Sequence, residues 1–181
     1  RLCFGELTPL SGRLTLFGRA RSGMRRDDIA RTRRRIGMVH QDCRFLDHLT
    51  VRENVSLPLV VAGFELSHED ANIDELLSWV GLEAHQDVRP PALSGGERQR
   101  AALARALILA PEVILADEPT GNIDWDMALR LLSLLTELNR MGKTILLATH
   151  DLNLIRAAKA QVSARVLRIR GRRVELAGAD L

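Results

Sequence analysis

The segment "EVILADEPTGNID", residues 112–124, contains a short apolar run that ends in two acidic residues, Asp117 and Glu118. An apolar run of this length with polar neighbours on both sides is typical of a buried strand, here over 113–116. Carboxylates at the carboxyl end of a buried parallel strand lie where ligands bind in open α/β sheets. The segment therefore predicts a strand and also the position of a site.

Two other segments predict strands of the same kind. "TILLAT", residues 144–149, ends at His150, and "IGMVH", residues 36–40, ends at Gln41. A helix is predicted over 126–140, because leucines recur there every three to four residues. Apolar strands that alternate with helices indicate parallel βαβ units. We therefore expect an α/β fold with a parallel sheet flanked by helices.

The region between the strand predicted at 36–40 and the strand predicted at 113–116 is different, because it shows helical signals and no strand. Thr50 and Glu53 have the spacing of a capping box, as do Ser67 and Asp70, and each box predicts the start of a helix. An alanine-rich helix is predicted farther along, over 98–109. This part of the chain is therefore expected to be helical.

The pattern divides the chain into a core and an insertion. A helical subdomain is expected over about 50–109, and the core is expected to comprise 1–49 and 110–181. Within the core, "GRLTLFG" at 12–18 alternates as a strand does, and 164–176 predicts a hairpin that turns near a glycine. The chain is long enough for one domain with a small subdomain.

The composition is that of an ordinary globular protein. The 181 residues are 46% hydrophobic and 27% charged, with a net charge of +3. No apolar run reaches the length of a membrane-spanning helix, and Cys3 and Cys43 form no disulfide or metal-binding pattern. Arginines crowd residues 25–35, where they either contact an anionic partner or form a solvated helix face. We expect the solvated face.

"LSGGERQR", residues 93–100, joins a serine and two glycines to an arginine-rich helix. Ser94 and Glu97 have capping-box spacing, and alone they predict a capped helix. Gly95 and Gly96 add nothing to a cap, but they remove side chains where the first N–H groups of the helix emerge. An anion can approach such groups at the positive end of the helix dipole. The motif is therefore a candidate phosphate-binding element.

The polar residues that follow the three strands form a second candidate site. Asp117 can bind Mg²⁺ directly or through water, and Glu118 can orient or deprotonate a water molecule. Gln41 can ligate a cation through its carbonyl oxygen, and His150 follows the third strand. A single acidic pair often only faces solvent, but three strand ends with such groups predict a Mg²⁺–phosphate site.

Together these motifs resemble those of the nucleotide-binding subunits of ABC ATPases. "LSGGERQR" is similar to the ABC signature, "VILADE" to the Walker B strand, "GNID" to the D-loop, "ATHD" to the switch-histidine segment and "VHQD" to the Q-loop. Their order and spacing also match, over nearly the whole chain. The resemblance implies a P-loop NTPase-like sheet, binding of ATP and Mg²⁺, and hydrolysis of ATP to ADP and phosphate.

The resemblance also implies roles for the residues at the strand ends. Asp117 and Gln41 would hold Mg²⁺, Glu118 would polarise the attacking water, and His150 would contact the γ-phosphate. These are the tasks of phosphoryl transfer, which depends on positioning and charge neutralisation more than on covalent chemistry.

The signature would belong to a second site. The resemblance implies a head-to-tail homodimer, in which each signature binds the nucleotide held by the other subunit. The residues that would bind it follow one another: Ser94, Gly95, Gly96 and Glu97. Asp124, in the D-loop, would connect the two sites.

The sequence contains no G-x-x-x-x-G-K-[ST], the loop that binds nucleotide phosphates in this family. It begins with "RLCF", and the first twelve residues resemble the end of the helix that follows such a loop. We therefore expect an N-terminally truncated ABC ATPase, whose P-loop and first strands lie before Arg1. Such a chain is expected to be inactive by itself.

Within the family, "DEPTGNID" and "LTVRENVSLPL" resemble the branch that holds cell-division ATPases, lipoprotein-release ATPases and macrolide exporters, and "QDCRFLDHLTV" favours the cell-division type. That type implies an integral membrane permease as partner, a peripheral location at the cytoplasmic face of the inner membrane, and no nucleic acid. The alternatives are an exporter ATPase of the same branch, a soluble ABC protein that acts on nucleic acid, and a regulatory module that does not hydrolyse ATP.

Overall fold

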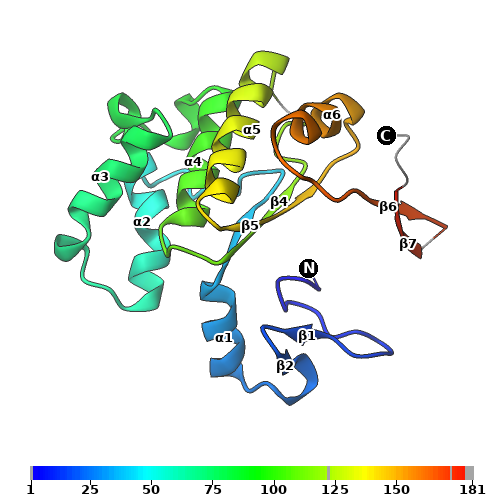
Figure 1. Cartoon of the computed structure of the whole chain (residues 1–181). Helices are drawn as coiled ribbons and strands as arrows, with labels where there is room; N and C mark the ends of the chain where they lie inside the picture. Colours follow the sequence, from blue (N-terminus) through cyan, green and yellow to red (C-terminus); the bar gives the residue numbers. More distant parts are fainter. Residues whose placement is uncertain (1, 122, 172, 178–181) are drawn as a thin grey trace.

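The computed structural model describes residues 2–121, 123–171 and 173–177. Its centre is a sheet of three parallel strands in the order β3–β4–β5 (Figure 1). The strands span Ile36–Val39 (β3), Val113–Asp117 (β4) and Thr144–Ala148 (β5). Because all three run in the same direction and in register, their carboxyl ends meet at one edge of the sheet. The expected α/β fold with a parallel sheet flanked by helices is confirmed.

Three helices lie beside this sheet and pack on it or on one another. α4 (Gly95–Leu107) packs against β3, α5 (Trp125–Arg140) lies beside α4, and α6 (Leu152–Gln161) packs on α5 (Figure 1). Buried side chains of the strands, α4, α5 and the loop after β3 form a first core: Val39, Cys43, Ala102, Leu103, Leu107, Ile114, Ala116, Leu131, Leu135 and Leu138.

A second core lies on another side of α4. There α2 (Val51–Ala62) and α3 (Asp70–Trp79) pack against α4 and against each other. Their buried side chains are Val51, Val55, Leu59, Ile73, Leu77, Val80, Leu82, Leu93, Ala101 and Ala104. α4 contributes small alanines to both cores, so this helix connects the sheet to the helical pair.

Of the two capping boxes predicted before the signature, one is confirmed and the other is wrong. The Thr50 hydroxyl accepts the N–H of Glu53, and the Glu53 carboxylate accepts the N–H of Thr50. Ser67, in contrast, lies in a separate 3₁₀ turn, and α3 begins only at Asp70 without a side-chain cap. The 3₁₀ turns span Arg21–Gly23, Leu66–His68, Glu83–His85 and Pro90–Ala92.

The amino-terminal part is a small hairpin followed by α1 (Arg26–Arg34). The strand predicted over 12–18 is wrong in its length, because β1 (Thr15–Leu16) pairs with β2 (Arg19–Ala20) through a tight turn with positive φ at Phe17 and Gly18. The segment before it forms a hydrogen-bonded turn in which Gly5 N–H donates to the Leu2 carbonyl, rather than the end of a helix.

The arginine cluster is only in part the solvated face that the sequence suggested. Arg33 lies over the ring of Phe4 and donates to the carbonyls of Phe4 and Gly5. Arg35 forms a two-fold hydrogen bond with Glu112, at 2.6 and 2.8 Å, and lies 3.7 Å from the ring centre of Phe17. These two arginines therefore hold the amino-terminal part against α1 and β4.

The prediction that 144–149 is a buried strand is wrong in one respect. β5 forms as predicted, but its side chains alternate between half-buried and exposed, and Leu146 is 44% exposed.

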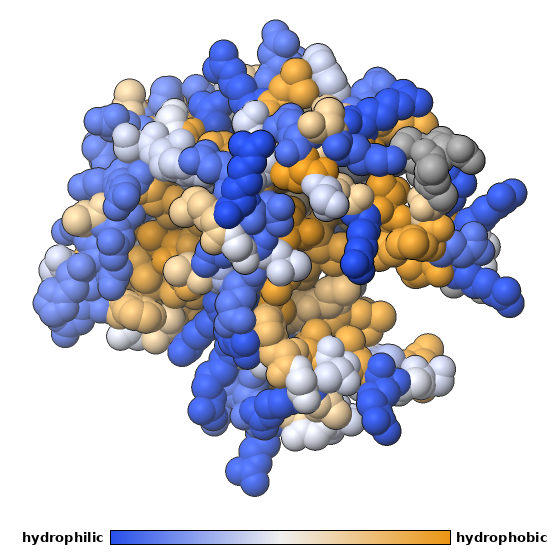
Figure 2. Space-filling model, viewed as in Figure 1, coloured by the Kyte–Doolittle hydropathy of each residue, from blue (hydrophilic) through white to orange (hydrophobic). Residues whose placement is uncertain are grey.

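A hairpin of β6 (Leu167–Arg170) and β7 (Arg173–Leu176) is exposed along its length, and apolar surface gathers over it in Figure 2. Among the helices that the structure describes, none combines the length and apolar character needed to cross a membrane.

Candidate functional site

The candidate residues after the strands lie at the edge where the strand ends meet. Gln41 follows β3, Asp117 is the last residue of β4 and Glu118 comes next, and His150 follows β5. Asp117 pairs with Ala148 in the ladder between β4 and β5. This register brings Glu118 level with the residues after β5. The structure thus brings together the four residues that the sequence predicted for this edge.

Glu118 is the most constrained of these residues. Its backbone has a φ of 44°, which is unusual and strained for a residue with a side chain. The N–H donates to the Ala148 carbonyl at 2.9 Å, which fixes the backbone to β5. Its carboxylate accepts the Thr149 hydroxyl at 3.2 Å and the His150 N–H at 3.0 Å. The carboxylate therefore has one defined position beside Asp117.

His150 contacts the same carboxylate with its ring. Nδ1 lies 2.7 Å from Oε1 of Glu118, so the ring donates its Nδ1 hydrogen to the carboxylate. This hydrogen bond and the negative charge of Glu118 raise the pKa of His150 above its usual value. The pair is therefore held together more strongly at a pH below the His150 pKa, where the ring is positive, and loses this attraction as the pH rises through it. The ring itself stays 88% exposed, so it is free to meet a ligand.

Asp117 and Gln41 offer the oxygen ligands that Mg²⁺ prefers. Asp117 is exposed, and the Gln41 side-chain nitrogen lies 3.7 Å from the place where a Cβ on Gly121 would stand. Gln41 therefore reaches the loop that follows Asp117 and Glu118. In the described part of the chain no group of three or more acidic, histidine or cysteine side chains could hold a metal ion. Two oxygen ligands fit Mg²⁺, which keeps most of its positions for water and substrate phosphates.

The predicted capping box of the signature is present. The Ser94 hydroxyl accepts the Glu97 N–H at 3.3 Å, and the Glu97 carboxylate accepts the Ser94 N–H at 2.8 Å. The N–H and hydroxyl of Ser94 lower the pKa of Glu97. The carboxylate also lies 3.3 Å from Nε2 of His85, a contact that no sequence motif indicated. Ser94 and Glu97 are thus fixed as the start of α4.

The two glycines of the signature lie in different surroundings. Gly95 is exposed, as the anion-approach interpretation requires. Gly96 is buried, and a Cβ there would stand 2.4 Å from the terminal carbon of Met127 in α5. A side chain at Gly96 would therefore displace the end of the Met127 side chain. The role of Gly96 in binding a nucleotide, like that of Gly95, stays a prediction.

Asp124 lies close to the same helix start. It is exposed, and its carboxylate accepts the Met127 N–H at 3.0 Å, so it caps α5. Because Met127 also covers Gly96, the D-loop end of α5 and the signature end of α4 are neighbours. A ligand at the signature would thus lie near Asp124 as well.

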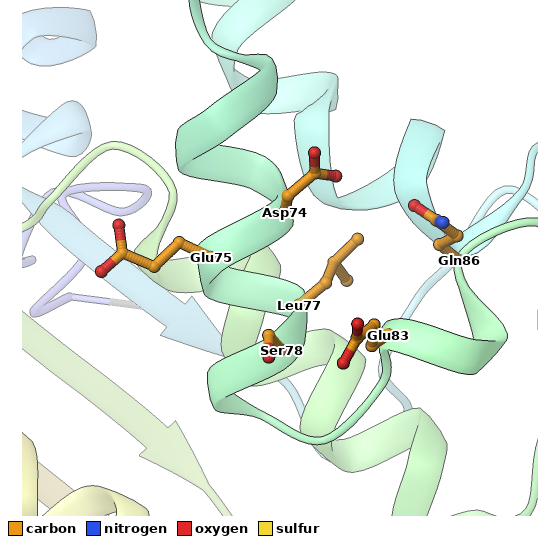
Figure 3. Close-up of a pocket in the computed structure, with 6 residues that line it drawn as sticks. All are labelled: Asp74, Glu75, Leu77, Ser78, Glu83 and Gln86. Carbon is orange, nitrogen blue, oxygen red and sulfur yellow. The ribbon is translucent and has the colours of Figure 1, made fainter.

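A surface hollow of about 430 Å³ lies away from these residues, between α3 and the turn after it (Figure 3). It is lined by Asp74, Glu75, Leu77, Ser78, Glu83 and Gln86. Arg52 donates to Asp74 and to Gln86, the latter at 3.1 Å, and also pairs with Asp70. These contacts hold α2 against α3, so Asp74 and Gln86 have a structural role in the hollow.

Several contacts at the site could not be found from motifs. Thr149 and His150 hold the Glu118 carboxylate, and Gln99 and Arg105 of α4 donate to the loop after β3. Each joins residues that lie 31 to 62 positions apart in the chain. Only the fold brings them together.

Comparisons with known proteins agree with this arrangement. The family model described as ABC transporter matches residues 1–121. The cell division ATP-binding protein FtsE of Haemophilus influenzae is 43% identical over 155 residues, which are 86% of this chain and 71% of the relative. The methionine import ATP-binding protein MetN of Geobacillus kaustophilus is 40% identical over 86% of this chain and 46% of the relative. The macrolide export protein MacB of Marinobacter nauticus is 40% identical over 85% of this chain and 24% of the relative.

Solved structures show the same likeness. The dimeric post-hydrolysis structure of the ATP-binding cassette MJ0796, bound to ADP and Pi, has a TM-score of 0.77 and 33% sequence identity. The match covers 85% of this chain and 69% of that one. A second dimeric structure of the same cassette also has a TM-score of 0.77, with 34% identity.

Proposed function

The chain belongs to the ABC transporter family of ATPases, and on this basis we propose that it is the ATP-binding and ATP-hydrolysing subunit of a membrane-associated ABC complex. One observation carries the proposal. Glu118 is held by three hydrogen bonds from Thr149 and His150 at the strand edge that also carries Asp117 and Gln41. A carboxylate fixed in this way beside a cation site is suited to orient a water molecule for attack on a phosphate.

Each residue has a separate task in this proposal. Asp117 and Gln41 would hold Mg²⁺, which supplies positive charge against the phosphates when it is bound. Glu118 accepts a hydrogen bond from the attacking water and aims it. His150, through its exposed ring, donates a hydrogen bond toward the γ-phosphate and keeps the carboxylate in position from the other side.

The signature serves the second half of a composite site. Ser94 and the backbone N–H groups of Gly95 and Gly96, at the positive end of α4, would offer donors to a phosphate. In the proposed head-to-tail homodimer this phosphate belongs to the nucleotide of the other subunit, and Asp124 lies between the two sites. The dimeric form of the related cassette MJ0796, with ADP and Pi bound, supports this assembly.

We further propose that the complex is of the FtsE type, with an FtsX-like permease as partner at the cytoplasmic face of the inner membrane. FtsE is 43% identical to this chain, against 40% for MetN and MacB. The small difference keeps a transporter ATPase as the second candidate. Co-expression decides between them: an FtsE-type subunit is retained by an FtsX-like permease and not by a MetN-type or MacB-type membrane domain.

The chain by itself is expected to bind no Mg-ATP that isothermal titration can measure. A P-loop supplies a lysine and a row of backbone donors to the phosphates, and the sequence contains no G-x-x-x-x-G-K-[ST]. A version extended at its amino end with the P-loop segment of the Haemophilus influenzae relative, here called the P-loop version, should bind Mg-ATP in the micromolar range and hydrolyse it. Micromolar binding by the unextended chain would contradict the proposal, as would a folded P-loop version that does not hydrolyse ATP.

A membrane partner is expected to contact the apolar surface at the end of α2. Large apolar side chains are exposed there and in the adjoining loops: Leu46, Val60, Val61, Phe64 and Leu66. Val61 is 75% exposed, so Val61→Glu should leave the melting temperature unchanged and remove the partner from a co-purification. Val174→Glu is the matched control, because Val174 is 64% exposed on the distant hairpin. Equal recovery of the partner with both variants would show that α2 is not the contact.

A further inference from the structure

The loop after β3 has a strained backbone. Cys43 and Arg44 are consecutive non-glycine residues with φ values of 56° and 44°. The Cys43 N–H donates to the His40 carbonyl at 3.0 Å, and the Arg44 N–H donates to the Asp42 carbonyl at 2.6 Å. Left-handed residues in succession are unfavourable for L-amino acids and persist only where their surroundings hold them. The loop over 41–45, here called the Q-turn, therefore needs an external restraint.

Arg105 of α4 provides a restraint of this kind. Its guanidinium donates to the Arg44 carbonyl at 2.8 Å and to the Cys43 carbonyl, and it lies 4.5 Å from the ring centre of Phe45. Burial lowers the pKa of Arg105. Among residues 2–121, 123–171 and 173–177, none of the ion pairs includes this arginine. Its charge is thus compensated by the Q-turn itself, through two carbonyls and an aromatic face.

Gln99 connects the other end of the Q-turn to the same helix. Its side-chain nitrogen donates to the Gln41 carbonyl at 3.4 Å, and the residue is only 2% exposed. The side chain of Cys43 packs in the same core cluster as Ala102 and Leu103, which lie between the two polar contacts. The Q-turn therefore lies along α4 from Gln99 to Arg105.

We propose that Arg105 is a positioning residue for Gln41. Arg105 lies on α4, the helix that Ser94 of the signature caps. It holds the Q-turn in its strained form and so fixes Gln41 beside the loop after Asp117. A shift of α4 would then move Gln41 with it. The role of Gln41 in Mg²⁺ binding rests on the proposed function, whereas the restraint on the Q-turn rests on the contacts alone.

The restraint can be measured in the unextended chain, without nucleotide, from the reactivity of Cys43. This thiol is only 4% exposed, so a thiol reagent reaches it when the Q-turn opens. In a Cys3→Ser background, Arg105→Lys should speed Cys43 labelling by about tenfold, because lysine keeps the charge but loses the planar fork and the stacking. Arg98→Lys is the matched control, since Arg98 also lies over Phe45, at 5.8 Å, but donates to Pro90 instead of the Q-turn. It should change the rate less than twofold.

Strain relief gives a second variant that does not weaken the fold. Arg44 is exposed and has positive φ, so Arg44→Gly removes the backbone strain without removing a buried side chain. It should slow Cys43 labelling by about threefold, both alone and together with Arg105→Lys. Equal labelling rates for Arg105→Lys and Arg98→Lys would overturn the restraint.

The link to Gln41 is tested in the P-loop version. Arg105→Lys should raise the Mg²⁺ concentration for half-maximal hydrolysis by several-fold at saturating ATP, and Arg44→Gly should restore it in part. Faster labelling with an unchanged Mg²⁺ requirement would overturn the positioning role. A P-loop version without any hydrolysis would instead contradict the proposed function, and the labelling rates would still decide the restraint.

Discussion

Glu118→Gln is expected to lower the rate of ATP hydrolysis by the P-loop version by about 10²–10⁴-fold, the usual effect of a lost general base. Glutamine has nearly the same shape. Its oxygen can accept the hydrogen bonds of His150 in place of Oε1, and its amide nitrogen can donate to the Thr149 hydroxyl in place of Oε2. It lacks the negative charge that polarises the attacking water. ATP binding should therefore remain, and an ATP-bound dimer should accumulate. Phosphate release measures the rate of hydrolysis, and isothermal titration measures the binding of ATP.

Glu112→Gln is the control for this variant. Glu112 directly precedes β4, at the end of the strand opposite to Glu118. Its side chain is 57% exposed, and its carboxylate pairs with Arg35. The same chemical change there should alter the hydrolysis rate less than twofold. Hydrolysis at the wild-type rate by the Glu118→Gln variant would show that this carboxylate does not orient the water.

The strand ends could be predicted from the sequence because polar residues directly follow short apolar runs. Parallel strands carry those residues to one edge whatever the order of the strands, so Gln41, Asp117, Glu118 and His150 could be grouped without the structure. The contacts between these residues could not be predicted from the sequence. The bond between His150 and Glu118 depends on the β4–β5 register and on the positive φ of Glu118, and neither leaves a local pattern in the sequence.

The errors have the same origin. Ser67 and Asp70 have the spacing of a capping box, but spacing cannot show that the chain makes a separate 3₁₀ turn first. Leu146 belongs to an apolar run, but the run does not show which strand faces are covered. The contact between Gly96 and Met127, which is 31 positions farther along the chain, likewise leaves no local pattern in the sequence.

In the proposed dimer the signature binds a nucleotide phosphate held by the second subunit, and Gly95 allows a direct test of this contact. Gly95 is exposed and is the first residue of α4. An aspartate in the first helical turn is favourable for the helix dipole, so Gly95→Asp should not destabilise the fold. The same charge would repel a phosphate at this position. Gly95→Asn has nearly the same size and no charge, and it is the matched control.

The deciding measurement is the molar mass of the P-loop version in Mg-ATP, determined by light scattering after size exclusion. The protein carries Glu118→Gln, so that hydrolysis does not dissolve the dimer. We predict a dimer with Gly95→Asn and a monomer with Gly95→Asp, although the aspartate variant melts at the same temperature as the asparagine variant or higher. A dimer of equal stability with both variants would contradict the claim that the signature binds the phosphate of the other subunit's nucleotide.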